Sequence, residues 1–187
     1  MTGEDTRHSV SVAGVVIDDD DRALVIRRRD NAHWEPPGGI LERDETITEG
    51  LIREVREETG LIVEPIALTG VYKNLSRGIV ALVFRCRAVG GILTENAEVT
   101  EFRWVRESVV NAIMSEAYAV RVLDAYRSGG APSIRDHDGV RLIASGSKAS
   151  PQRACVGRLL IVGGGGEPRE VGGGSPVNLE DRVGVVL

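Results

Sequence analysis

The sequence predicts an α+β fold in which a sheet lies between helices. Strand-like runs of apolar and β-branched residues occur on both sides of a segment with helical periodicity. The apolar content of 42% in 187 residues suffices for a proper core. Of the 23 glycines, 13 follow residue 126. We therefore expect a folded domain over residues 1–126 and a glycine-rich C-terminal tail over residues 127–187.

The strands and helices are expected in a definite order. After a pair of strands and a loop, Thr46 and Glu49 have the spacing of a helix-capping box, and Gly60 is typical of a helix end. A later helical region is expected to begin at a cap, Ser108, and to run to about Tyr126. The expected strands are residues 10–17, 23–28, 62–74, 78–89 and 101–105.

The expected tail differs in charge from the domain. The formal charge is −7 before residue 127 and +2 after it. Clustered glycines and few large apolar side chains give such a segment little to offset the entropy of ordering it. One apolar run, "CVGRLLIV", could add a strand to an exposed sheet edge or pair with a second chain, which makes a homodimer possible. We expect a protein that ends at Ser128 to fold and remain active.

Composition argues against several classes of protein. The formal charge of −5 argues against a protein that coats nucleic acid or an anionic membrane. Cys86 and Cys155 are far apart and have no metal-ligand spacing. The start of the chain lacks an apolar signal core, and no apolar run approaches the ~18 residues of a membrane span. These features predict a soluble, cytoplasmic protein.

The stretch "REVREETG" (residues 53–60) gathers three glutamates on one side of the expected helix. Glu54, Glu57 and Glu58 fall within an arc of about 100°. Each like-charge contact costs roughly 0.2–0.5 kcal/mol, and Gly50 in the same arc costs about 1 kcal/mol relative to alanine. A solvated face with ion pairs such as Arg53–Glu57 is one explanation. A bound divalent cation with the preceding loop packed against Gly50 is the other, and it also explains the repelling carboxylates and the glycine.

The region around this helix resembles a known motif. The stretch "GILERDETITEGLIREVREETGL" (residues 39–61) has glycine, five residues, glutamate, seven residues and then Arg-Glu-Val-x-Glu-Glu-x-Gly-Leu. It is similar to the Nudix box at every defined position. The resemblance extends over residues 9–126 and is to MutT-like Nudix hydrolases. It implies an α/β/α sandwich with a mixed central sheet. It also implies Mg²⁺- or Mn²⁺-dependent hydrolysis of a nucleoside diphosphate linked to another group, X, so the expected partner is a small nucleotide.

The same resemblance implies a role for each residue of the box. Glu57 and Glu58 would be metal ligands, together with the carbonyl of Gly39. Glu54 would be a ligand or the general base. Arg53 would orient the glutamates by ion pairing.

Two further carboxylates are implied around the box. Glu45 would tether the loop to the helix. Members of the family often take another metal ligand from a later loop, where this chain offers Glu95, Glu98 and Glu101. Glu98 is favoured because it lies at the end of the loop rather than within the following strand.

Substrate contacts are expected from "VIRRRD", which resembles the arginine pair at a strand end in MutT-like proteins. By this analogy Arg27 or Arg28 would contact the phosphates or base of the substrate. The stretch "HWEPPGG" is similar to the W-E-F-P-G-G of the same proteins, with Pro36 in place of the aromatic residue. Trp34 is expected to be a packing residue.

The alternative function is a catalytically silent module of the same fold that binds nucleotide as a sensor. Such proteins usually lack some glutamates of the box, and this chain has all of them. The tail also shows no helix-turn-helix pattern. A hydrolase is therefore favoured.

Overall fold

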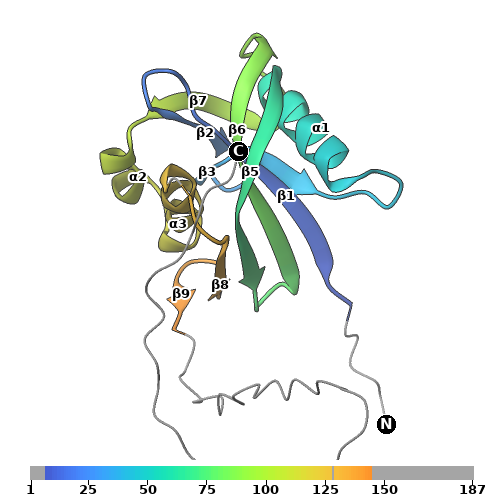
Figure 1. Cartoon of the computed structure of the whole chain (residues 1–187), viewed down its shortest axis with the longest axis vertical. Coiled ribbons are helices and arrows are strands. Elements are labelled where there is room, and N and C mark those ends of the chain that lie inside the picture. The colour runs from blue at the N-terminus through green and yellow to red at the C-terminus, as the bar shows by residue number, and fades with distance from the viewer. Residues whose placement is uncertain (1–6, 128, 145–187) are drawn as a thin grey trace, which may run out of the picture. The chain divides into compact units, whose positions relative to one another are not determined.

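The computed structural model describes residues 7–127 and 129–144 (Figure 1). No helix in these ranges is long and apolar enough to cross a membrane. The elements follow in the order β1 (Ser9–Val16), β2 (Ala23–Arg28), β3 (Trp34–Glu35), β4 (Gly38–Ile40), α1 (Ile47–Thr59), β5 (Leu61–Asn74), β6 (Ile79–Gly91), β7 (Val99–Val105), α2 (Glu107–Ile113), α3 (Glu116–Tyr126), β8 (Ser133–His137) and β9 (Leu142–Ile143).

The strands form two sheets. The larger has the order β4-β1-β6-β5-β8-β9, and the smaller has the order β3-β2-β7. In the larger sheet β1 pairs parallel with β6 and β5 pairs parallel with β8, whereas its other pairs are antiparallel. The larger sheet is thus mixed, with α1 and α3 lying on either side of its central strands (Figure 1). This arrangement confirms the expected α+β fold.

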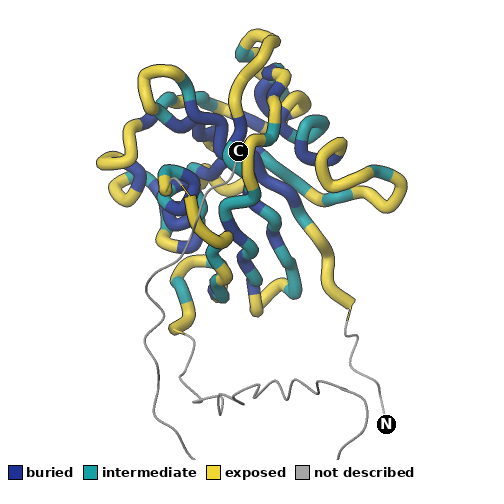
Figure 2. The backbone as a smooth tube through the Cα atoms, viewed as in Figure 1, coloured by how far each residue is buried: buried dark blue, intermediate teal, exposed yellow. Residues whose placement is uncertain are grey.

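Strand β1 is buried on both faces, which explains why its sequence is almost continuously apolar. Val12 and Val16 pack in the core cluster to which α1 contributes Leu51 and Val55. Val15, which points to the opposite face, packs in the cluster that includes side chains of α2 and α3. Buried residues accordingly follow the strands and the inner sides of the helices (Figure 2).

The five strands expected from sequence are all present as β1, β2, β5, β6 and β7. The helical region expected over residues 108–126 is instead two helices. Helix α2 ends at Ile113, Met114 is extended, and α3 begins after Ser115. Ser108, expected as a cap, lies inside α2, where Arg106 occupies the N-cap position. Apolar residues continue at helical spacing through this break, so the pattern does not reveal it.

The sheet continues beyond residue 126. Strand β8 pairs with β5 from Gly70 to Asn74, and the side chain of Arg135 donates to both oxygens of Asp124 at 2.7 and 2.8 Å. The hydroxyl of Tyr72 also donates to Asp124, at 2.8 Å. Two strands of the larger sheet, β8 and β9, thus follow the domain boundary predicted at residue 126. The run "CVGRLLIV" lies outside the described residues.

Candidate active site

Helix α1 carries the glutamates of the box and has both of the expected caps. The Oγ1 of Thr46 accepts from the backbone N–H of Glu49 at 3.2 Å, and the Glu49 carboxylate accepts from the backbone N–H of Thr46 at 2.8 Å. At the other end, Gly60 has φ of 78° and donates its N–H to the carbonyl of Arg56. The left-handed conformation at the C-cap favours glycine. The capping box and the glycine stop predicted from sequence are confirmed.

The loop before α1 packs against Gly50, as the glycine in the helix suggested. A Cβ at this position would lie 2.5 Å from Leu41 Cδ1 and 2.6 Å from Glu45 Oε1. Side chains of the loop, rather than its backbone, make this close approach. Glycine at residue 50 therefore leaves room for the side chains of Leu41 and Glu45 to pack on the helix.

Arg53 connects the loop to the glutamates of α1. Its Nε and Nη2 donate to the two oxygens of Glu45, and its Nη1 donates to Glu54 at 2.9 Å and to Glu57 at 3.1 Å. The hydrogen bonds from Arg53 lower the pKa of Glu45 to about 2. Nη2 also donates to the carbonyl of Ile40 at 3.2 Å. One guanidinium thus fixes the loop and two carboxylates of the helix together.

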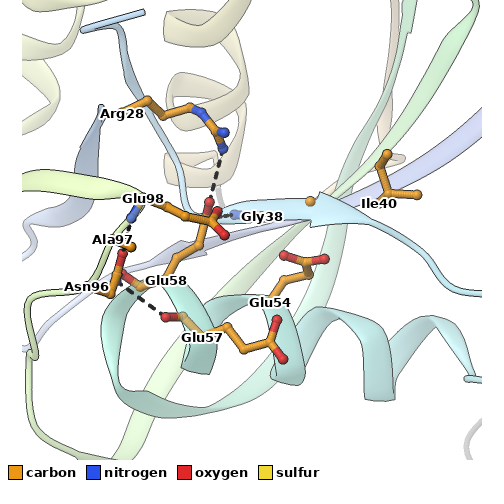
Figure 3. A pocket seen from close by; sticks show the side chains of 10 residues that line it. Arg28, Gly38, Ile40, Glu54, Glu57, Glu58, Asn96, Ala97 and Glu98 are labelled. Carbon is orange, nitrogen blue, oxygen red and sulfur yellow. Dashed lines mark hydrogen bonds and ion pairs between the residues drawn. The ribbon is translucent and has the colours of Figure 1, made fainter. Parts of the chain in front are cut away.

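These residues border a cleft of about 560 Å³ between α1, β4 and the loop before β7 (Figure 3). Five of the residues expected to hold a metal line it, and one of the two expected arginines does so as well. Its lining consists of Arg28, Gly38, Gly39, Ile40, Glu54, Glu57, Glu58, Asn96, Ala97 and Glu98.

Glu58 is the most enclosed carboxylate of the cleft, with 3% of its surface exposed. Its two oxygens accept from the backbone N–H of Gly38 at 2.7 Å and from Nη1 of Arg28 at 3.2 Å. Burial raises the pKa of Glu58 to about 8 despite these contacts. Burial likewise raises the pKa of Glu54. The side chain of Glu57, in contrast, is 61% exposed.

Gly39 and Glu54 approach each other so closely that no side chain would fit between them. A Cβ on Gly39 would overlap the carboxylate of Glu54. The absence of a side chain at Gly39 thus lets a carboxylate of α1 lie directly against the backbone of β4. This contact places a glutamate of the box beside the backbone expected to supply a carbonyl ligand.

The loop before β7 brings Glu98 to the cleft, whereas Glu101 lies within β7 and pairs with Arg103 at 2.7 Å. Asn96, which the sequence did not single out, holds this loop in place. Its Nδ2 donates to the carbonyls of Glu58 at 2.6 Å and of Glu57 at 3.3 Å. An asparagine two residues before an acidic loop end was the only available signal in the sequence.

Of the two expected arginines, only one reaches the cleft, because successive side chains of a strand point to opposite faces. Arg28 lines the cleft and contacts Glu58. Arg27 does not line it, and its Nη1 instead lies 3.8 Å from Glu101 on the neighbouring strand. Trp34 packs against the core and lies under the guanidinium of Arg103, 4.5 Å from the ring centre.

The donor set of the cleft fits a hard divalent cation, which prefers carboxylate and carbonyl oxygens. In the arrangement described, no three His, Cys, Asp or Glu side chains within residues 7–127 and 129–144 already converge on one point. Arg53 occupies one oxygen of Glu54 and one oxygen of Glu57. An ion can therefore bind the second oxygen of each carboxylate while Arg53 holds the first. The buried Glu58 and half-buried Glu54 would gain most, because a cation would stabilise their charged forms.

Comparison with known proteins agrees with the geometry. A model of the NUDIX domain family matches residues 7–125. A MutT-like protein from Streptomyces ambofaciens is 55% identical over 139 residues, covering 74% of this chain and 90% of that protein. An ADP-ribose pyrophosphatase from Methanocaldococcus jannaschii is 36% identical over 103 residues, covering 50% of this chain and 60% of that protein.

The fold has solved counterparts. The crystal structure of an ADP-ribose pyrophosphatase from Streptococcus suis has a TM-score of 0.58 at 20% identity, covering 70% of this chain and all of that chain. At this identity the likeness concerns the fold alone. The match of the family over most of the described residues and the identity to the Streptomyces protein lead to one conclusion. The chain belongs to the NUDIX domain family.

Proposed function

We propose that this protein hydrolyses the diphosphate bond of a nucleoside diphosphate linked to another group, with Mg²⁺ or Mn²⁺ as cofactor. The observation that carries the proposal is the cleft in which Glu54, Glu57 and Glu58 of one helix face Glu98 and the backbone of β4. Four carboxylates around one cleft repel an anionic diphosphate unless cations lie between them. The archaeal relative named as an ADP-ribose pyrophosphatase also supports action on a diphosphate.

The residues divide into those that would hold the ion and those that hold these ligands in place. The carboxylates of Glu54, Glu57, Glu58 and Glu98 and the carbonyl of Gly39 would hold it. When bound, such an ion neutralises phosphate oxygens and lowers the pKa of a coordinated water. Arg53 positions Glu54 and Glu57 through Nη1, and the N–H of Gly38 positions Glu58. Glu54, Glu57 and Glu58 are thus each anchored by a neighbouring donor.

Two side chains of the protein can take a direct part in the proposed reaction. Glu54, when it is not a ligand, can accept the proton of the attacking water as a general base. Arg28 lies where the cleft meets the end of β2 and can donate to a phosphate oxygen of the substrate. Its present contact with Glu58, at 3.2 Å, would be relieved when a metal takes over the charge of that carboxylate.

A hydrolysis screen tests the proposal. The purified protein is incubated with nucleoside triphosphates, nucleoside diphosphates, ADP-ribose and nucleotide sugars, each with Mg²⁺, with Mn²⁺ and with a chelator. We expect metal-dependent cleavage of at least one diphosphate bond, seen by chromatography of both products. Tight binding of a nucleotide without turnover under every condition would favour the alternative, a catalytically silent sensor module.

A further inference from the structure

A second cavity, of about 260 Å³, adjoins the catalytic cleft. The two share Arg28 and the residues of β4. The second cavity extends toward α3, which contributes Tyr118 and Arg121, and toward β3, which contributes Glu35. Its volume is below the roughly 300–1,000 Å³ of pockets for whole drug-sized ligands. It suits one part of a substrate whose diphosphate lies in the neighbouring cleft.

Arg121 lines this cavity with a guanidinium that is only partly paired. Its Nε is buried and has no hydrogen-bond partner. No ion pair within the described ranges includes Arg121. The guanidinium instead lies over the rings of Tyr118, at 4.8 Å, and Tyr72, at 5.5 Å. A buried donor of this kind destabilises the fold while it remains unpaired.

The imidazole of His137 lies beside Arg121 and contacts only its Nη2. His137 is fully buried, and its Nδ1 accepts from the backbone N–H of Gly139 at 3.0 Å. An imidazole that accepts at Nδ1 carries its proton at Nε2. That Nε2 lies 3.2 Å from Nη2 of Arg121 and accepts from it only in the other tautomer, in which the N–H of Gly139 loses its acceptor. In either tautomer the Nε of Arg121 retains its capacity to donate to a ligand.

Glu35 supplies the complementary group. It is 8% exposed, and its nearest cationic atom, Nε of Arg28, is 3.5 Å away. Burial raises the pKa of Glu35. The buried carboxylate of Glu35 disfavours a phosphate group next to itself, because two anions would then share a desolvated site. A neutral ligand that offers both an acceptor oxygen and an N–H donor satisfies Arg121 and Glu35 together.

We propose that the second cavity binds a nucleobase by its lactam edge, with the base carbonyl accepting from Arg121 and the adjacent ring N–H donating to Glu35. This inference rests on the proposed function, which places the nucleotide's diphosphate in the neighbouring cleft. Guanine, hypoxanthine, uracil and thymine have a carbonyl next to a ring N–H, whereas adenine and cytosine do not. Arg121 and Glu35 would thus be specificity-determining residues.

Inosine and adenosine nucleotides provide the sharpest test, since their bases differ only in this edge. Isothermal titration with inosine 5′-monophosphate and adenosine 5′-monophosphate measures recognition without any need for turnover. We expect the wild-type protein to bind the inosine nucleotide at least ~10-fold more tightly. Equal affinities would overturn the proposal, whether or not the protein is a hydrolase.

Variants then show which residues recognise the base. Arg121→Met should abolish the preference by weakening the binding of the inosine nucleotide alone, and Glu35→Leu should do the same. Arg87→Met is the matched control, because Arg87 pairs with the exposed Glu64 and lines neither cavity. An equal loss for both nucleotides in Arg121→Met would show that Arg121 binds phosphate, which contradicts the proposal. If circular dichroism shows that either variant fails to fold, the affinities of the wild-type protein for the two nucleotides still test the proposal.

Turnover separates this inference from the proposed function. We expect kcat/KM for inosine 5′-triphosphate to be at least ~10-fold higher than kcat/KM for adenosine 5′-triphosphate. Hydrolysis of both with equal kcat/KM would overturn the lactam subsite and leave the hydrolase standing. Preferential binding of the inosine nucleotide without hydrolysis of any nucleotide would support the subsite and overturn the proposed hydrolase.

Discussion

Arg53 donates two hydrogen bonds to Glu45, from Nε to Oε2 at 2.9 Å and from Nη2 to Oε1 at 2.6 Å. The same guanidinium reaches Glu54 and Glu57 through Nη1. A lysine offers a single ammonium and cannot reproduce this fork. The pair therefore sets both the position of the loop and the direction of the carboxylates.

Replacing Arg53 with lysine should lower kcat by ~10- to 100-fold, because misplaced ligands impair catalysis even when they remain present. The thermal midpoint should fall by only a few degrees, since the loss is of partly exposed ion pairs. Arg56→Lys, an exposed arginine of the same helix, is the control. Equal turnover in the two variants would remove Arg53 from the positioning role. Steady-state kinetics and a thermal melt provide the two measurements.

Glu57→Gln should reduce metal-dependent turnover at least ~10²-fold, because it removes one anionic ligand and its charge together. The side chain is 61% exposed, so folding should be unaffected. Glu64→Gln, which alters an exposed glutamate on β5, should retain wild-type rates. Turnover of Glu57→Gln within about threefold of wild type would contradict its assignment as a metal ligand.

Glu98→Gln should lower kcat with little change in the thermal midpoint, since Glu98 is exposed at the edge of the cleft. Glu101→Gln serves as its counterpart, because Glu101 pairs with Arg103 away from the cleft. We expect the second variant to turn over normally. The reverse pattern would transfer the catalytic role to Glu101.

Arg28→Ala should raise KM more than it lowers kcat, by about 10-fold or more if a charge-assisted hydrogen bond to substrate is lost. Arg27→Ala should leave both constants close to those of wild type, because that side chain lies on the other face of β2. Steady-state measurement of KM and kcat for the two variants checks the assignment. Wild-type constants in both variants would mean that neither arginine contacts the substrate.

Truncation tests where the folded unit ends. A protein that ends at Ala144 keeps β8 and β9, and we expect it to fold and to hydrolyse substrate. A protein that ends at Ser128 loses Arg135, and the buried Asp124 keeps Arg127 and Tyr72 as partners. Loss of hydrogen bonds to a charged group in this way costs about 1.5–3 kcal/mol. Urea denaturation of both proteins measures the difference, and equal stability would restore the earlier boundary.

The sequence predicts α1 and its surroundings well because the signals there are local. The cap at Thr46, the stop at Gly60 and the glycine at residue 50 each act on residues within one or two turns or on the adjoining loop. Apolar alternation likewise places the five longer strands. The resemblance to the Nudix box adds the expected ligands, and the structure gathers Gly39, Glu54, Glu57, Glu58 and Glu98 around one cleft.

The features that sequence reasoning missed depend on distant partners. Strand β8 is short and polar, and it is held by pairing with β5 and by Asp124 of α3. Asn96 acts on carbonyls 38 and 39 residues earlier in the chain. Arg27 and Arg28 are adjacent residues of the same type, and only the alternation of side chains along β2 shows which of them faces the cleft. No local pattern encodes any of these contacts.

The two adjoining cavities differ in how freely their walls can change during evolution. The catalytic cleft draws most of its carboxylates from α1, where the same short segment also provides caps and packing, so substitutions there affect folding and chemistry at once. The second cavity shares Arg28 and β4 with the cleft, but the rest of its lining comes from β1, β3, α3 and other parts of the chain outside α1. Its lining can therefore diversify while the catalytic helix stays constant. A scaffold divided in this way permits new substrate preferences to arise by a few replacements without rebuilding the reaction centre.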